Sequence, residues 1–104
     1  MSTASGSDGW KPPNVWRTVA ASTNLTTVSG IPKRRAAVII FENNNVAVQT
    51  AVFTGDDGVN VTVSVPLQSV YPPLYGDFET VGALGATVTC VAGWIDDGSV
   101  QLNA

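Results

Sequence analysis

Residues 59–65 have the sequence VNVTVSV, with valine at every odd position and a small polar residue at every even one. Because successive side chains of a strand point to opposite faces of a sheet, this period of two predicts a half-buried β-strand. Pro66 follows directly, and since proline lacks a main-chain N–H it ends the strand or places it at a sheet edge. This stretch is the clearest structural signal in the chain.

Further strand patterns lie on both sides of this segment. Residues 35–42 (RAAVIIFE) form a nearly continuous apolar run, typical of a strand covered on both faces. No stretch has the 3.6-residue period of a helix. We therefore predict an all-β fold, a small antiparallel β-sandwich or barrel of about six to eight short strands. The predicted strands are 17–23, 35–42, 46–54, 59–65, 74–81 and 86–95, with turns at 43–45, 55–58, 82–85 and 96–98.

An extended N-terminal arm is predicted over residues 1–16, and residues 17–104 are predicted to form a single β domain. Ser, Gly and Thr dominate the start of the arm, and Pro12 and Pro13 favour extended geometry over a helix or a central strand. The arm also contains Trp10 and Trp16. These either fold back on their own domain or dock on a neighbouring subunit, where aromatic side chains are enriched.

The basic and acidic residues are separated along the sequence. Residues 1–35 hold all five basic side chains and one acid, and residues 36–104 hold the other seven acids. Charged residues make up only 12% of the chain, about half of the ~25% usual in a soluble domain. This composition predicts exposed apolar surface, as in an obligate oligomer or a lattice component. The separation of basic from acidic residues predicts head-to-tail contact between copies, in which the basic end of one copy meets the acidic part of the next.

The residues needed for catalysis are scarce. The chain has no histidine, so the commonest general base and metal ligand is missing. Its single cysteine, Cys90, excludes an intrachain disulfide and a Cys-rich metal site, and is predicted to be a small core residue on the same side as Val88, Ala92 and Trp94. We therefore predict no catalytic residues, no metal, no cofactor and no enzymatic activity.

Three charged groups have alternative interpretations. The Asp-Asp-Gly runs at 56–58 and 96–98 favour ordinary turns, with contact to an ion as the minority alternative. Asp77 and Glu79 share one strand face, which is too little for a glycosidase site. The cluster 33–35 (KRR) favours an acidic surface of a partner protein, with simple solvation as the alternative, over nucleic acid, since the pI is about 4.4 and no aromatic residue is interleaved. No apolar segment is long enough for a membrane span, and the start does not resemble a signal peptide.

The order of these features resembles that of small virion proteins of tailed bacteriophages. A basic residue begins an apolar strand at 35–40 (RAAVII), a hairpin follows, and then come 65–74 (VPLQSVYPPL) and a closing strand after 81–88 (VGALGATV). Head-spike base proteins have a V-P-x-G-x-x-x-P connection, and here Gln68 stands where that pattern has glycine. Their T-G-T-T-A turn corresponds to 81–86 without the threonines. The likeness covers roughly residues 25–95.

The resemblance implies a capsid decoration, or cement, protein. Such a protein binds the major capsid protein on the capsid exterior, after synthesis in the host cytoplasm, and increases capsid stability. It implies a homo-oligomer, with a homotrimer favoured and the pentamer of a vertex head-spike base as the alternative. A tail or spike protein, or a carbohydrate-binding module using Tyr71, Tyr75 and Trp94, is the remaining interpretation. The residues predicted to contact other subunits or the capsid are Trp10, Pro12, Pro13, Trp16, Arg17, Lys33, Arg34 and Arg35.

Overall fold

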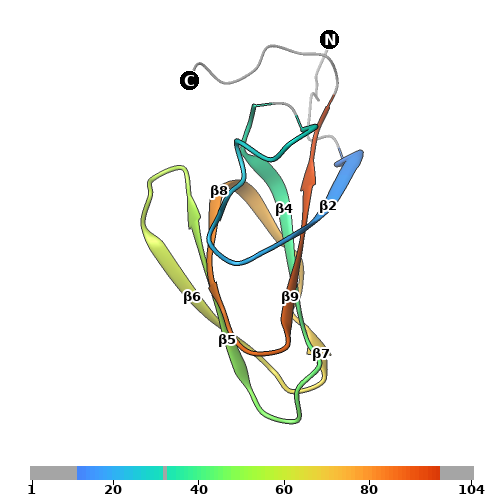
Figure 1. Cartoon of the computed structure of the whole chain (residues 1–104), viewed down its shortest axis with the longest axis vertical. Coiled ribbons are helices and arrows are strands. Elements are labelled where there is room, and N and C mark those ends of the chain that lie inside the picture. The colour runs from blue at the N-terminus through green and yellow to red at the C-terminus, as the bar shows by residue number, and fades with distance from the viewer. Residues whose placement is uncertain (1–11, 32, 97–104) are drawn as a thin grey trace.

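A computed structural model of the chain describes residues 12–31 and 33–96, which form an antiparallel β structure without any helix (Figure 1). The all-β prediction is confirmed. The strands are β2 (Val15–Val19), β3 (Thr23–Asn24), β4 (Ala36–Asn43), β5 (Gln49–Gly55), β6 (Asn60–Val65), β7 (Ser69–Val70), β8 (Leu74–Leu84) and β9 (Val88–Trp94).

The strands form one open sheet that folds over on itself at β8. The strand order is β2-β9-β4-β8-β5-β6, with β3 added to β8 and β7 added to β4. The first half of β8 pairs with β4, at Leu74 opposite Ile39, whereas its second half pairs with β5, at Val81 opposite Phe53. The long strand therefore connects two layers, and the molecule has the character of a small β-sandwich.

Aromatic rings join the two layers in the core. The Phe53 ring of β5 lies 5.4 Å from the Phe78 ring in an edge-to-face arrangement and 6.2 Å from the Phe41 ring of β4, between ring centroids. Trp94 is completely buried, and its Nε1–H faces the carbonyl oxygens of Leu25 and Arg34, each at 3.2 Å. This satisfies a polar group whose burial without a partner would be costly.

Two predictions about buried strands are confirmed. No residue from Ala36 to Phe41 is exposed, as expected for a strand covered on both faces. Cys90 lies in the core with Val88, Ala92 and Trp94. Burial raises the pKa of the Cys90 thiol to about 12, because desolvation disfavours the thiolate. The thiol is therefore protonated and unreactive at neutral pH.

The predicted strand bounds were wrong at three places. The first strand begins at Val15, inside the predicted arm, and ends at Val19. The return strand begins at Gln49 instead of residue 46. The strand β8 passes through Gly82 to Leu84, and the turn lies at 85–87. Gly82 belongs in the strand because a Cβ there would lie 3.2 Å from Cγ1 of Val52, so glycine permits the close approach of β5 and β8.

The half-buried pattern at 59–65 holds only for the second part of the strand. Val65 is fully buried and Val63 is partly covered, but Val59 and Val61 are exposed. The strand lies at the edge of the sheet, and its start extends beyond the core. Pro66 follows β6, as predicted.

Candidate interaction surfaces

The end of the predicted arm belongs to the folded domain. The side chain of Asn14 donates to the carbonyl oxygen of Asp96 and accepts from its N–H, both at 2.8 Å. The rings of Pro13 and Trp16 cover Gly93, where an added Cβ would lie 2.8 Å from the Trp16 ring and 3.0 Å from Cβ of Pro13. Trp16 therefore packs on its own domain while remaining 43% exposed. Trp10 lies outside the described residues.

The predicted basic residues lie in two places. Arg17 is exposed in the middle of β2, next to the 28–31 loop, where a Cβ on Gly30 would be 3.6 Å from its Nη2. Arg34 and Arg35 lie directly before β4. The guanidinium of Arg34 donates to the carbonyl oxygen of Ile95 at 2.6 Å. Pro12 and Lys33 are exposed.

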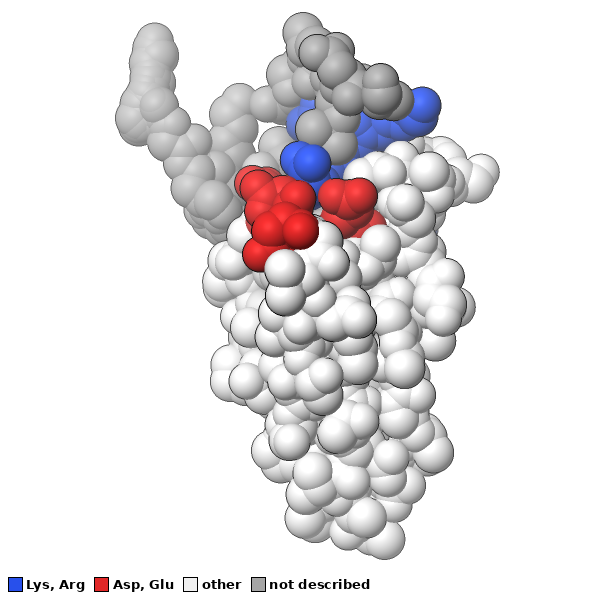
Figure 2. Space-filling model, turned by 90° about the vertical axis from the view of Figure 1, so that its left-hand side faces the viewer, with Lys and Arg blue, Asp and Glu red and all other residues white. Residues whose placement is uncertain are grey.

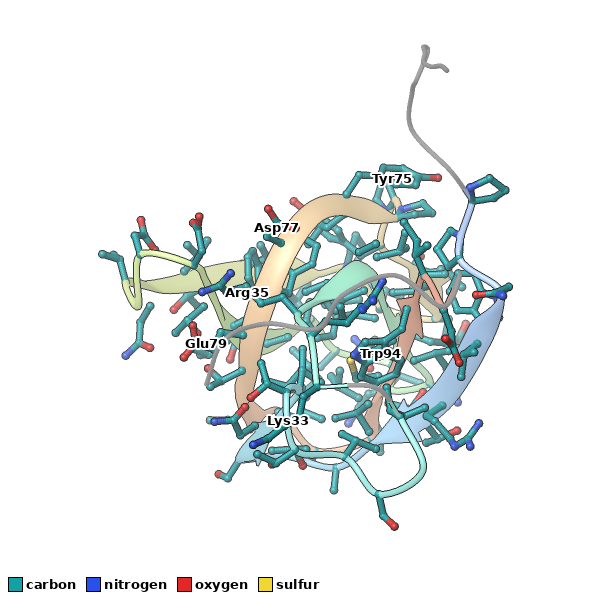
Figure 3. The ribbon with its side chains drawn as sticks, turned by 90° about the horizontal axis from the view of Figure 1, so that it is seen from above. Lys33, Arg35, Tyr75, Asp77, Glu79 and Trp94 are labelled. Atoms are coloured by element: carbon teal, nitrogen blue, oxygen red, sulfur yellow. The ribbon has the colours of Figure 1, made fainter. Side chains whose placement is uncertain are left out.

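The basic cluster meets an acidic group within its own chain. Nε of Arg35 lies 3.5 Å from Oε1 of Glu79 on β8, and Figure 3 shows Arg35 beside the part of β8 that carries Asp77 and Glu79. Both side chains are about one third exposed, so solvent screens this pair and it contributes little to stability.

Charges that are far apart in the sequence lie together in space. On the face shown in Figure 2, basic and acidic side chains gather side by side at one end of the molecule. The acidic turn at Asp56 and Asp57 is next to Asp77, since a Cβ on Gly55 would be 3.4 Å from the Asp77 carbonyl oxygen. Head-to-tail contact between copies stays a prediction, and the gathering of described basic and acidic side chains at one end weakens the electrostatic argument for it.

The first Asp-Asp-Gly run forms the predicted turn. Gly58 has a φ of 72°, its N–H donates to the Gly55 carbonyl, and Oδ1 of Asp57 accepts from the N–H of Val59. Within residues 12–31 and 33–96, no group of three or more Asp, Glu or Cys side chains is arranged to hold a metal ion. The second run extends past the described residues at Asp97.

An exposed apolar surface, whose location the sequence did not predict, lies at the opposite end of the molecule (Figure 1). It comes from the loop between β4 and β5, the link after β6, and β7. We call it the apolar tip, and Glu42, which pairs with Val70, is the charged residue beside it. The most exposed member is Val46, at 76%. The apolar tip consists of Val46, Val48, Leu67 and Val70.

A single buried side chain joins loops at the apolar tip. Asn43 is completely buried at the end of β4 and its amide reaches three loops. Its Nδ2 lies within hydrogen-bond distance of three carbonyl oxygens, and its Oδ1 accepts from two donors. Both the donor and the acceptor of the Asn43 amide are therefore satisfied despite their burial. The acceptors are Ala47 (3.0 Å), Val65 (3.1 Å) and Pro66 (3.2 Å), and the donors are the N–H of Asn45 (2.8 Å) and the hydroxyl of Thr87 (3.2 Å).

The aromatic residues proposed for sugar binding do not form a platform. Trp94 is buried in the core, so it cannot stack on a ligand, which corrects its inclusion in this set. Tyr75 is 63% exposed on β8 and Tyr71 is partly covered. Figure 3 shows Tyr75 on the outside of the molecule and Trp94 inside it.

Comparison with known proteins identifies no relative. No protein-family model matches the chain, and no match was found among curated proteins or solved structures. The described residues contain no helix that could cross a membrane.

Proposed function

We propose that this chain is a structural virion protein that binds the outer surface of a bacteriophage capsid as a homo-oligomer. The observation that carries the proposal is the apolar tip, an exposed and uncharged set of side chains next to the buried Asn43, which hydrogen-bonds the loops there. Exposed apolar patches with a defined shape are typical of protein-binding surfaces. The sequence resemblance to decoration and head-spike base proteins supplies the class of partner, a major capsid protein.

The proposed mechanism is geometric. Each copy bridges neighbouring capsid subunits and buries apolar area at seams that the shell leaves weak. A standard interface of about 1,600 Å², repeated by symmetry, resists internal pressure without requiring any strong single contact. A homotrimer at local three-fold positions is the favoured arrangement, with a vertex pentamer as the alternative. No step in this role requires a catalytic group or a cofactor.

The conformation of Gln68 supports the resemblance. Its φ is 46°, in the left-handed region that glycine adopts without steric cost. Gln68 is also the position where the head-spike base pattern has glycine. The local backbone is thus one that favours glycine, which is compatible with the glycine of that pattern, although the residue differs.

Gln68→Gly should raise the free energy of unfolding by about 0.5–1 kcal/mol, because relief of left-handed strain exceeds the added flexibility of the unfolded chain. Urea unfolding measures the change. Leu67→Gly is the matched control in the same link, since Leu67 is not among the residues with positive φ, and it should lower stability. A destabilised Gln68→Gly variant would show that the side chain of Gln68 contributes more than its strain costs.

Capsid binding is tested with purified heads that lack this protein, from the phage whose genome encodes it. Wild-type protein should bind them and raise the temperature at which they release DNA. Val46→Asp should lower occupancy about ten-fold or more, since it places a charge on the most exposed residue of the tip. Ser29→Asp, an exposed change in the loop after β3, should bind like wild type. Equal occupancy for all three proteins would overturn the role of the apolar tip, and no binding by wild type would overturn the proposed function.

The two tryptophans should respond differently. Trp10→Ala is expected to lower occupancy on heads without changing the melting temperature, if the arm contacts a neighbour or the capsid. Trp16→Ala should lower the melting temperature as well, because the Trp16 ring covers Gly93. Occupancy measured on purified heads and thermal melting of the free protein separate these effects. Unchanged occupancy for Trp10→Ala would remove the arm from the interface.

A further inference from the structure

The strand β6 has an open edge. It pairs with β5 from Asn60 opposite Thr54 to Val65 opposite Gln49, and no described residue pairs with its other edge. Figure 2 views the molecule from the side on which β6 lies in Figure 1, and below the charged end this face shows no charged side chain. An unpaired strand edge presents a row of N–H and C=O groups that can pair with another strand.

This edge lacks the features that usually prevent such pairing. Residues 60–65 contain no charge and no proline, and their pairing with β5 has no bulge. The other end of the sheet differs, since β2 carries the charged Arg17 at its centre and follows Pro12 and Pro13. The β6 edge is therefore the more suitable of the two for strand addition.

The direction of the main-chain groups of β6 follows from its neighbours. The carbonyl oxygen of Thr50 accepts from the N–H of Gly85, so the main-chain groups of Thr50 face β8 and not β6. Ser64, which lies opposite Thr50, is therefore not hydrogen-bonded to β5. Because this direction alternates along a strand, Asn60, Thr62 and Ser64 all point their N–H and C=O groups outward.

We propose that two copies of this chain associate by antiparallel pairing of their β6 strands about a two-fold axis at Thr62. In this register Thr62 lies opposite Thr62 of the partner copy, and Asn60 lies opposite Ser64. All outward groups are then paired, giving about six main-chain hydrogen bonds. Moving the axis to Val63 would place Asn60 opposite Pro66, which lies outside β6 and has no N–H, so within the strand that register pairs only Thr62 with Ser64.

The side chains agree with the same register. Val61, which is 42% exposed, lies opposite Val63 of the second copy, and Val59 lies opposite Val65. The polar face pairs Asn60 with Ser64 and Thr62 with Thr62. Cross-strand pairs of like character stabilise a sheet, and the pairing covers two of the exposed valines. The self-complementarity of this one strand is what identifies a second copy as the partner.

This inference goes beyond the proposed function and is separable from capsid binding, because a two-fold contact joins two copies and is not the contact that builds a trimer or a pentamer. A two-fold edge contact uses β6, whereas the proposed capsid contact uses the apolar tip. The two contacts can therefore coexist in one particle, and either can fail without the other.

Cross-linking tests the register. Thr62→Cys places two thiols on directly opposite residues, whose Cα atoms would be about 5.5 Å apart, within the range for a disulfide. Mild oxidation should give a covalent dimer on non-reducing denaturing gels, and the buried Cys90 should not react. Thr50→Cys, exposed on β5 one strand inward, is the control and should stay monomeric. Failure of Thr62→Cys to cross-link, or cross-linking no better than Thr50→Cys, would overturn the proposal.

Proline substitution tests the hydrogen bonds. Thr62→Pro removes an outward N–H that makes no bond to β5, so the monomer should keep its far-ultraviolet spectrum while self-association weakens about ten-fold or more. Val63→Pro removes an inward N–H and should disrupt the fold itself. Association is measured by light scattering across a concentration series. A folded Thr62→Pro variant with wild-type association would contradict edge pairing even if the wild type is oligomeric and binds heads.

Discussion

Asn43→Ala is expected to lower the free energy of unfolding by about 3 kcal/mol or more. The substitution removes the amide that joins three loops, including one fully buried hydrogen bond to Val65 and two part-buried ones to Ala47 and Pro66. Each lost hydrogen bond contributes about 0.5–1.5 kcal/mol, and each buried group left unpaired adds a desolvation penalty. Urea unfolding of the free protein measures the loss.

The neighbouring asparagine provides the control. Asn44 is exposed in the same turn, so Asn44→Ala should change stability by less than about 0.5 kcal/mol. Asn43→Asp adds a pH test. Burial would raise the pKa of the introduced carboxyl in the folded state, so this variant should be least stable above that raised pKa and recover as the pH falls from it toward the unfolded carboxyl pKa. Equal effects for Asn43→Ala and Asn44→Ala would contradict the role assigned to Asn43.

Phe53→Ala should lower the free energy of unfolding by a similar amount, about 3–5 kcal/mol, because it opens a cavity between the two layers. The Phe53 ring contacts both Phe41 and Phe78, so its removal weakens the packing of β5 against β4 and β8 together. Domains are stable by only about 5–15 kcal/mol, so the variant would be close to unfolding at room temperature.

Phe53→Leu separates ring contacts from volume. It keeps most of the apolar bulk and should cost about 1–1.5 kcal/mol. Both variants are compared with wild type by thermal melting and urea unfolding. A loss below 1 kcal/mol for Phe53→Ala would mean that the two layers are held together mainly elsewhere.

Strands whose pattern is local were predictable from the sequence. The apolar run of β4, the alternation in β6 and the buried face shared by Cys90 and Trp94 depend only on neighbouring residues. The bounds of β8 were not predictable, because Gly82 resembles a turn residue until Val52 is placed against it. The start of β2 was hidden by the preceding prolines, which favour extended structure without indicating a partner strand.

The candidate surfaces depended more on tertiary structure. The triplet at 43–45 predicts a turn, but the burial of Asn43 results from loops more than twenty residues away, at Val65 and Thr87. The mixing of charge at one end results from the pairing of β4 with β8, which brings Arg35 to Glu79. The composition correctly predicted exposed apolar residues, and only the fold shows that several of them form one tip.

The position of β9 sets when this chain can complete its fold during synthesis. It is the last described strand, yet it lies between β2 and β4 and is the only described strand paired with β2. A nascent chain that has not yet extended past Trp94 leaves β2 without a partner and β4 with one edge open. Such a chain exposes apolar strand edges to pairing with other chains. Premature truncation before Val88 should therefore yield aggregates or degraded fragments instead of a smaller soluble domain.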